Sequence, residues 1–150
     1  MSVDEQQHQD EHKTIVRRLF DDAINARNWD HAERFIASNV IDHTAPSWAP
    51  PGIAGFKQQM IAWFSAFPDS HFDIDDMIAQ GDRVTIRWTV EGTQEGIFRD
   101  IPPTGKHITM SGIDEVRIAF GQIVEHWGYP DLLGLLDQLG AAPWSQAAKQ

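Results

Sequence analysis

The sequence predicts an α+β domain in which a curved, mixed or antiparallel sheet forms a cone around helices from the N-terminal part of the chain. Up to about residue 67, apolar residues recur at the three- and four-residue spacing of amphipathic helices. From about residue 71, the pattern changes to the alternation that is typical of half-buried strands. Helices followed by an antiparallel sheet indicate the α+β class.

A chain of 150 residues is long enough for one domain with a substantial core. We expect a flexible N-terminus at residues 1–10, a single domain at residues 11–140 and a loosely ordered tail at residues 141–150. The acidic, polar start does not resemble a secretory signal, and no apolar run reaches the length of a membrane span. We therefore expect a cytoplasmic protein.

Three helices and one short strand are predicted before residue 70. The first helix ends near residue 27 and has an apolar stripe of Ile15, Val16, Leu19, Phe20, Ala23 and Ile24. A short helix begins near residue 29 and includes Ile36, and residues 40–43 form a small strand before a proline-rich loop. A third helix covers residues 53–67, because Pro68 ends it.

The second half of the chain is predicted to form the sheet. Residues 71–76 alternate in polarity, and a second alternating run, residues 84–90, follows a turn. A rigid loop at residues 101–105 precedes a hairpin whose tight turn contains Phe120 and Gly121. A short apolar helix follows the hairpin.

The composition argues against several classes of protein. The formal net charge is −10 and the 12 Lys and Arg residues are scattered, so we expect binding to neither nucleic acid nor an anionic membrane. The absence of cysteine excludes disulfides, thiolate nucleophiles and cysteine-bound metals. The seven histidines lack the spacing of a metal site, and no serine-hydrolase elbow or nucleotide-binding loop is present. We expect no metal and no cofactor.

One acidic residue stands out in the hairpin. Alternation places Asp114 on an otherwise apolar face with Ile108, Met110, Val116 and Ile118. A half-buried acid must be paired, hydrogen-bonded or functional, and a carboxylate in an apolar cavity is suited to act as a general base. The alternative is that Asp114 has a purely structural role, as a buried acid that accepts hydrogen bonds from backbone amides or from the indole N–H of Trp127.

Two histidines are candidate partners of this acid. His126 is suited to donate a hydrogen bond to Asp114, and His43, at the end of the short strand, is expected at the cavity mouth. Two alternatives stay open: His126 pairs with Glu115 at the surface, and His43 caps a loop beside Asp42.

The register of the hairpin decides whether His126 reaches the cavity. A simple two-residue turn places Asp114 opposite Trp127, which leaves His126 on the other face of the sheet. The two side chains share one face only if a β-bulge interrupts a strand between them, and Gly112 or Gly128 suits such a bulge. We predict this bulge.

The order of the elements and several segments closely resemble the SnoaL-like polyketide (ester) cyclases; these segments are VIDHTAP, GIAGFKQQM, IPPTGK, SGIDEVRI and GQIVEHWGYPDLLGLLDQLG. The resemblance extends from about Lys13 to Gly140. It implies the nuclear transport factor two-like fold, which is the cone described above. It also implies an intramolecular aldol ring closure of a polyketide ester without a cofactor, with an aspartate as acid and base.

The resemblance implies that this aspartate lies two residues after the histidine of the EHW segment. This chain has Gly128 at that position. Either the carboxylate has moved across the hairpin to Asp114, or the activity is different.

We interpret the chain as a cofactor-free acid/base enzyme for a small, largely apolar carbonyl compound, with Asp114 as base and with His126 and His43 as its hydrogen-bond partners. We expect the apolar walls of the cavity to include Trp63, Trp88, Met110 and Trp127. Two other functions stay open. One is a non-catalytic binding domain of the same fold. The other is an epoxide hydrolase, which needs a water held by several polar side chains; two acids and an inward-facing arginine or asparagine would favour it.

The outer face of the sheet is expected to form an interface. A row of outward-facing side chains on this face combines neutral polar and charged groups, so it can be buried in an isologous contact. The row consists of Thr85, Arg87, Thr89, Thr109 and Ser111. We therefore predict a homodimer.

Overall fold

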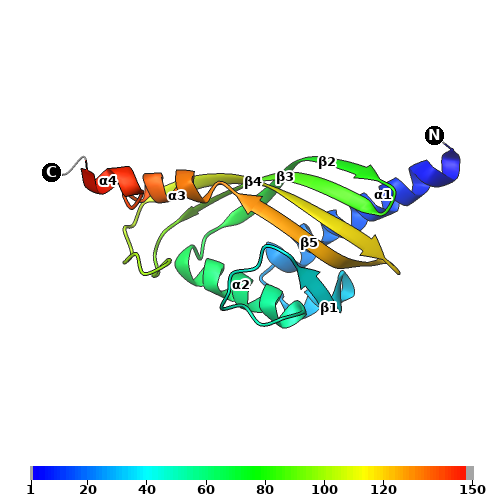
Figure 1. Cartoon of the computed structure of the whole chain (residues 1–150), viewed down its shortest axis with the longest axis horizontal. Coiled ribbons are helices and arrows are strands. Elements are labelled where there is room, and N and C mark those ends of the chain that lie inside the picture. The colour runs from blue at the N-terminus through cyan, green and yellow to red at the C-terminus, as the bar shows by residue number, and fades with distance from the viewer. Residues whose placement is uncertain (1, 148–150) are drawn as a thin grey trace.

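The structure is a computed structural model that describes residues 2–147 (Figure 1). Five strands form one sheet in the order β1-β5-β4-β3-β2. β1 runs parallel to β5, and the other neighbours are antiparallel. The strands are β1 (Ile36–Asp42), β2 (His71–Gln80), β3 (Arg83–Thr93), β4 (His107–Ala119) and β5 (Gln122–Pro130).

The helices are α1 (Val3–Arg18), the π-helical turn η1 (Leu19–Ile24), the 3-10 helix η2 (Asp30–Arg34), α2 (Ile53–Ala66), α3 (Leu132–Gln138) and α4 (Pro143–Ala147). Figure 1 shows the sheet curving over α2, with β1 beside that helix. This arrangement confirms the predicted α+β class and the cone-shaped sheet. Within residues 2–147, no helix is long and apolar enough to cross a membrane.

The first helix begins earlier than the sequence pattern predicts. α1 starts at Val3 rather than near residue 11, because Ser2 and Glu5 form a reciprocal capping box. Farther along, the predicted apolar stripe is buried in the core from Val16 through η1. The expected flexibility of residues 1–10 stays a prediction.

The strand β1 also begins earlier than predicted. The sequence pattern places Ile36 in a short helix, but η2 ends at Arg34 and Ile36 pairs with Ile123 of β5. This long-range pairing overrides the local helical pattern. The third predicted helix agrees with α2, which ends one residue before Phe67.

The β4–β5 hairpin has the predicted tight turn. Phe120 and Gly121 both have positive φ angles, of 53° and 74°, and Ala119 pairs with Gln122 across the turn. This geometry matches the right-handed twist of the two strands.

A β-bulge interrupts β5 just after this turn. The register shifts between Arg117 and Ile118 of β4, which leaves Val124 of β5 as the additional residue. The structure therefore contains the predicted bulge, but the prediction of its position was wrong: it lies at Val124 and at neither Gly112 nor Gly128.

The C-terminal segment packs against the end of the sheet through short helices. Ala142 is buried, and the indole N–H of Trp144 in α4 donates a hydrogen bond to Asp137 Oδ1 at 2.7 Å. These contacts hold the first part of the segment that we expected to be loosely ordered. Residues 148–150 of that segment lie outside the described residues.

Candidate active site

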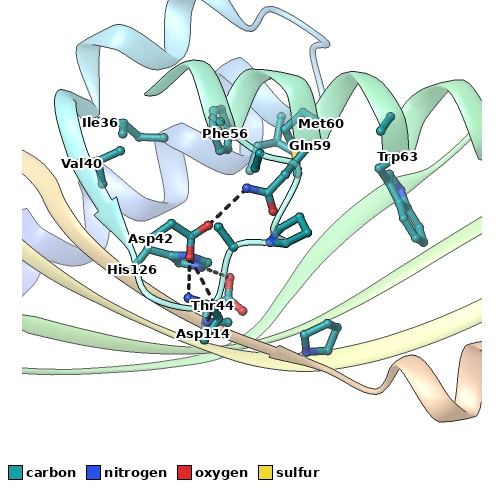
Figure 2. Close-up of a pocket in the computed structure, with 18 of the residues that line it drawn as sticks. Ile36, Val40, Asp42, Thr44, Phe56, Gln59, Met60, Trp63, Asp114 and His126 are labelled. Carbon is teal, nitrogen blue, oxygen red and sulfur yellow. Dashed lines mark hydrogen bonds and ion pairs between the residues drawn. The ribbon is translucent and has the colours of Figure 1, made fainter. Parts of the chain in front are cut away.

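A large cavity lies between α2 and the concave face of the sheet (Figure 2). Its volume is about 1080 Å³, and its walls are mainly aromatic and aliphatic, with Phe56, Met60, Trp63, Phe72, Trp88 and Met110 among them. Three of the four predicted wall residues, Trp63, Trp88 and Met110, thus line the cavity. An apolar hollow with a few convergent polar groups is suited to a small organic ligand.

Three polar side chains from three neighbouring strands form a hydrogen-bonded row along the sheet side of this cavity (Figure 2). His126 Nδ1 lies 3.0 Å from Asp42 Oδ1, and His126 Nε2 lies 3.0 Å from Asp114 Oδ2. A doubly protonated imidazole donates to both carboxylates at once. We call this row of Asp42, His126 and Asp114 the Asp–His–Asp relay.

The bulge at Val124 makes the relay possible. Beyond the bulge, Asp114 pairs directly with Gly128, and Val116 pairs with His126. Directly paired residues point to the same side of a sheet, so Asp114 and His126 both face the cavity. Asp42 joins them because β1 pairs with β5 at His126.

The two carboxylates of the relay differ in how many hydrogen bonds they accept. Besides His126, Asp42 accepts from Gln59 Nε2 at 3.3 Å, from the Thr44 backbone N–H at 3.1 Å and from the Thr44 hydroxyl at 3.3 Å. Within the described part of the chain, Asp114 accepts only from His126 and from the indole N–H of Trp88, at 3.0 Å. Since a carboxylate has about four acceptor sites, two on each oxygen, Asp114 retains more free lone pairs than Asp42, whose Oδ1 alone takes three of its four bonds.

The hydrogen bonds of the relay fix the charges of His126 and Asp42. Burial lowers the pKa of His126, but the hydrogen bonds and negative charges of Asp114 and Asp42 outweigh burial and raise the pKa to about 10. Burial likewise raises the pKa of Asp42, and the bonds from His126, Gln59 and Thr44 outweigh it and lower the pKa to about 2. At neutral pH, His126 is therefore an imidazolium and Asp42 a carboxylate.

Gly128 leaves the space that the Asp114 carboxylate and the His126 ring occupy. A Cβ atom at this position would lie 2.8 Å from His126 Cε1 and 3.1 Å from Asp114 Oδ1. A side chain here would have to displace one of these two groups. The resemblance implies an aspartate at position 128, and its directly paired neighbour in this chain is Asp114.

The structure contradicts the predicted places of His43 and Trp127, which do not line the cavity. Each follows a relay residue in its strand or loop, so its side chain points to the opposite face. There the two rings stack, with centroids 4.6 Å apart, and His43 Nε2 lies 3.0 Å from Glu125 Oε1. The N–H group that caps Asp114 belongs to Trp88, and the alternative that named Trp127 was also wrong.

The sequence interpretation missed two residues of the site, Asp42 and Gln59. Asp42 directly precedes His43 on a short strand, and strict alternation allows only one of the two to face inward. Gln59 lies three residues after Phe56 and four before Trp63, so it shares the apolar stripe of α2. A polar residue on an apolar stripe is the same signal that identified Asp114.

Across residues 2–147, no group of three or more His, Cys, Asp or Glu side chains is placed so that it could hold a metal ion.

Comparison with known proteins places the chain in a family. The family model described as SnoaL-like polyketide cyclase matches residues 14–139. Aklanonic acid methyl ester cyclase DnrD from Streptomyces peucetius is 25% identical over 134 residues, which cover 87% of this chain and 90% of that protein. The cyclase of the same name, DauD, from Streptomyces sp. strain C5 is 27% identical over 135 residues, which cover 87% of this chain and 81% of that protein.

Two solved structures extend the comparison to the fold. AclR from Streptomyces galilaeus has 26% sequence identity and a TM-score of 0.79, over 90% of this chain and 88% of that chain. TsrD from Streptomyces laurentii has 27% identity and a TM-score of 0.75, over 94% of this chain and 98% of that chain. The predicted nuclear transport factor two-like fold is thereby confirmed, and the chain belongs to the SnoaL-like polyketide cyclase family.

Proposed function

We propose that the protein is a cofactor-free acid/base enzyme that cyclises or isomerises a small, largely apolar carbonyl compound. The observation that carries this proposal is the Asp114 carboxylate, which faces an apolar cavity with free lone pairs and has the imidazolium of His126 beside it. The names of the two cyclase relatives support ring closure of a polyketide methyl ester as the first reaction to test.

In the proposed ring closure, Asp114 removes a proton from the carbon next to one carbonyl group. The electron pair of the broken C–H bond forms an enolate, whose carbon attacks a second carbonyl carbon of the same molecule. A C–C bond forms, and the electrons of that carbonyl move to its oxygen. The oxygen then takes back the proton that Asp114 received, so the protein ends unchanged.

Gln59 is the proposed donor to the enolate oxygen. Its side-chain amide has two N–H groups, of which one is hydrogen-bonded to Asp42. The second donates no hydrogen bond within residues 2–147, so it is available to a substrate oxygen in the cavity that Gln59 lines. His126 and Trp88 hold the Asp114 carboxylate in one orientation, and Asp42 holds His126.

Deuterium exchange tests this proposal before the natural substrate is known. Aklanonic acid methyl ester is incubated with the protein in D₂O, and exchange at the carbon next to a carbonyl is followed by mass spectrometry. Wild-type protein should accelerate exchange, and Asp114→Asn should reduce the rate about 10²- to 10⁴-fold, because a positioned base contributes roughly that factor. Ligand affinity should change little.

The matched control is Glu115→Gln, which removes a carboxylate from the next residue on the opposite face of β4. It should leave the exchange rate unchanged. Equal rates for wild type and Asp114→Asn would contradict the enzyme function.

A non-catalytic binding domain is the second candidate, and Gly128 at the position of the implied aspartate favours it. In that case the ester binds to wild type and to Asp114→Asn equally well, and neither protein accelerates exchange. The same experiment therefore separates the two functions.

A further inference from the structure

A single cationic side chain lines the cavity away from the relay. Arg99 is the only lysine or arginine among the described residues of the lining. Its guanidinium lies 5.9 Å from the ring centroid of Phe98. Within residues 2–147, no carboxylate forms an ion pair with Arg99 and no acceptor takes a hydrogen bond from its side chain.

The backbone around Arg99 forms a defined turn. Phe98 and Ile101 exchange two backbone hydrogen bonds, of 3.0 Å and 2.8 Å, around Arg99 and Asp100. Both central residues have positive φ angles, 47° and 65°, which neither an arginine nor an aspartate adopts without cost. The turn therefore holds Arg99 in place although its local conformation is unfavourable.

The turn is also anchored to the wall of the cavity. The ring of Phe98 packs against Trp63, with centroids 5.8 Å apart, and against Phe67, with centroids 5.5 Å apart. These contacts of Phe98 fix the backbone of Arg99 next to the aromatic wall, whereas the Arg99 side chain itself is exposed to solvent.

Arg99 and the relay belong to different ends of the sheet. The loop that contains Arg99 joins the end of β3 to the start of β4 at His107. Asp114 lies seven residues after His107, so it is roughly 23 Å along β4, at about 3.3 Å per residue, from the point where this loop joins the strand. Trp63, Phe72 and Trp88 line the apolar space that both ends share.

We propose that the ligand carries a carboxylate that Arg99 binds, at the end opposite to the carbonyl group that meets Asp114. The assignment of the reacting end rests on the proposed function. The two aspartates of the relay repel an anion from their end of the cavity, whereas a guanidinium without a protein partner attracts one and can bind it through two parallel hydrogen bonds. The ligand class is then an elongated apolar compound with a free carboxylate at one end and the reacting carbonyl groups at the other; the methyl ester of the exchange experiment supplies only the reacting end.

The test compares naphthylhexanoic acid with its methyl ester, which lacks the charge and has one additional methyl group, so the loss of the preference in an Arg99 variant is the result that isolates the charge. Their binding is followed by calorimetry at low salt. Wild-type protein should bind the acid about fivefold more tightly than the ester, the size expected for one exposed ion pair. Arg99→Asn should abolish this preference and keep the affinity for the ester, because asparagine tolerates a positive φ angle. Arg99→Lys should retain part of the preference.

The control variant is Arg87→Asn, which removes an arginine from the outer face of β3 and should preserve the preference. Equal affinity of wild type for acid and ester, an unchanged preference in Arg99→Asn, or failure of both probes to bind would overturn the proposal.

The result of this binding experiment does not depend on the result of the deuterium-exchange experiment. Asp114→Asn should keep the preference for the acid while it loses deuterium exchange. If exchange depends on Asp114 but the preference for the acid is absent, only the role of Arg99 fails.

Discussion

His126 retains its charge because carboxylates face both nitrogens of its ring. Its pKa in the fold, about 10, is higher than its ordinary value of 6.5. The stabilisation by the charged ring is therefore complete below pH 6.5 and is lost as the pH rises through 10. On the acid side, the pKa of Asp42 falls from 3.8 to about 2, so that its contribution is present above pH 3.8 and is lost as the pH falls through 2.

This linkage predicts the pH dependence of a His126 variant. At pH 6, His126→Gln should lower the free energy of unfolding by about 3 kcal/mol, because it leaves two carboxylates without their cation. The difference from wild type should shrink as the pH rises from about 7 to 10, measured by urea denaturation. His71→Gln is the control, because His71 and its partner Asp73 are exposed on the outer surface. A difference that does not vary with pH would contradict the charged relay.

Sequence patterns identify some residues of the site and miss others for a physical reason. Asp114 was found because it interrupts an apolar face, and that signal needs only the alternation of one strand. Asp42 and His43 are neighbouring polar residues on a short strand, and nothing in the sequence tells which of them faces inward. The pairing of β1 with β5 decides this, and it joins segments that lie far apart in the chain.

At the scale of single elements, the β4–β5 hairpin sets the position of the catalytic candidates. Its tight turn contains Phe120, a fully exposed aromatic residue with a φ angle of 53°. A bulky residue in this region is strained, whereas asparagine followed by glycine is the preferred sequence for such a turn. The hairpin therefore forms in spite of a poor residue at its turn.

Phe120→Asn should consequently stabilise the protein by about 0.5–1 kcal/mol, because it relieves the strain and keeps the register. Thermal unfolding followed by circular dichroism measures the change. Phe120→Val, which puts a β-branched residue at the same angle, should be destabilising. If asparagine lowers the melting temperature, the turn does not have the geometry described here.

The elements themselves were more predictable than their registers. Periodicity gives α2 and the four antiparallel strands, because each has its own apolar face. It does not give the start of β1 at Ile36, which depends on a parallel partner, or the bulge at Val124, which depends on how strongly the hairpin twists. The sequence indicated that a bulge was needed and did not locate it.

At the scale of the whole molecule, the sheet separates two surfaces with different properties. The relay crosses three strands on the concave face: Asp42 and His126 are direct partners, and Asp114 lies diagonally across from His126, two residues before its direct partner Val116. The convex face carries the polar row named above, together with exposed apolar side chains of Ile78, Ile113 and Tyr129. Ile113 pairs with Arg87 on one side and with Tyr129 on the other, so it lies in the middle of this mixed surface.

The predicted homodimer would bury this convex face around a two-fold axis, with the cavities left on the outer sides of the assembly. Light scattering at micromolar concentration should give about twice the chain mass of 17.0 kDa. Ile113→Arg should yield a monomer, because it places like charges near each other at the contact, and it should leave probe binding in the cavity unchanged. Phe120→Asn, which alters an exposed aromatic residue at the hairpin tip, should remain dimeric. A monomeric wild type, or a dimer that Ile113→Arg does not weaken, would exclude this face as the interface.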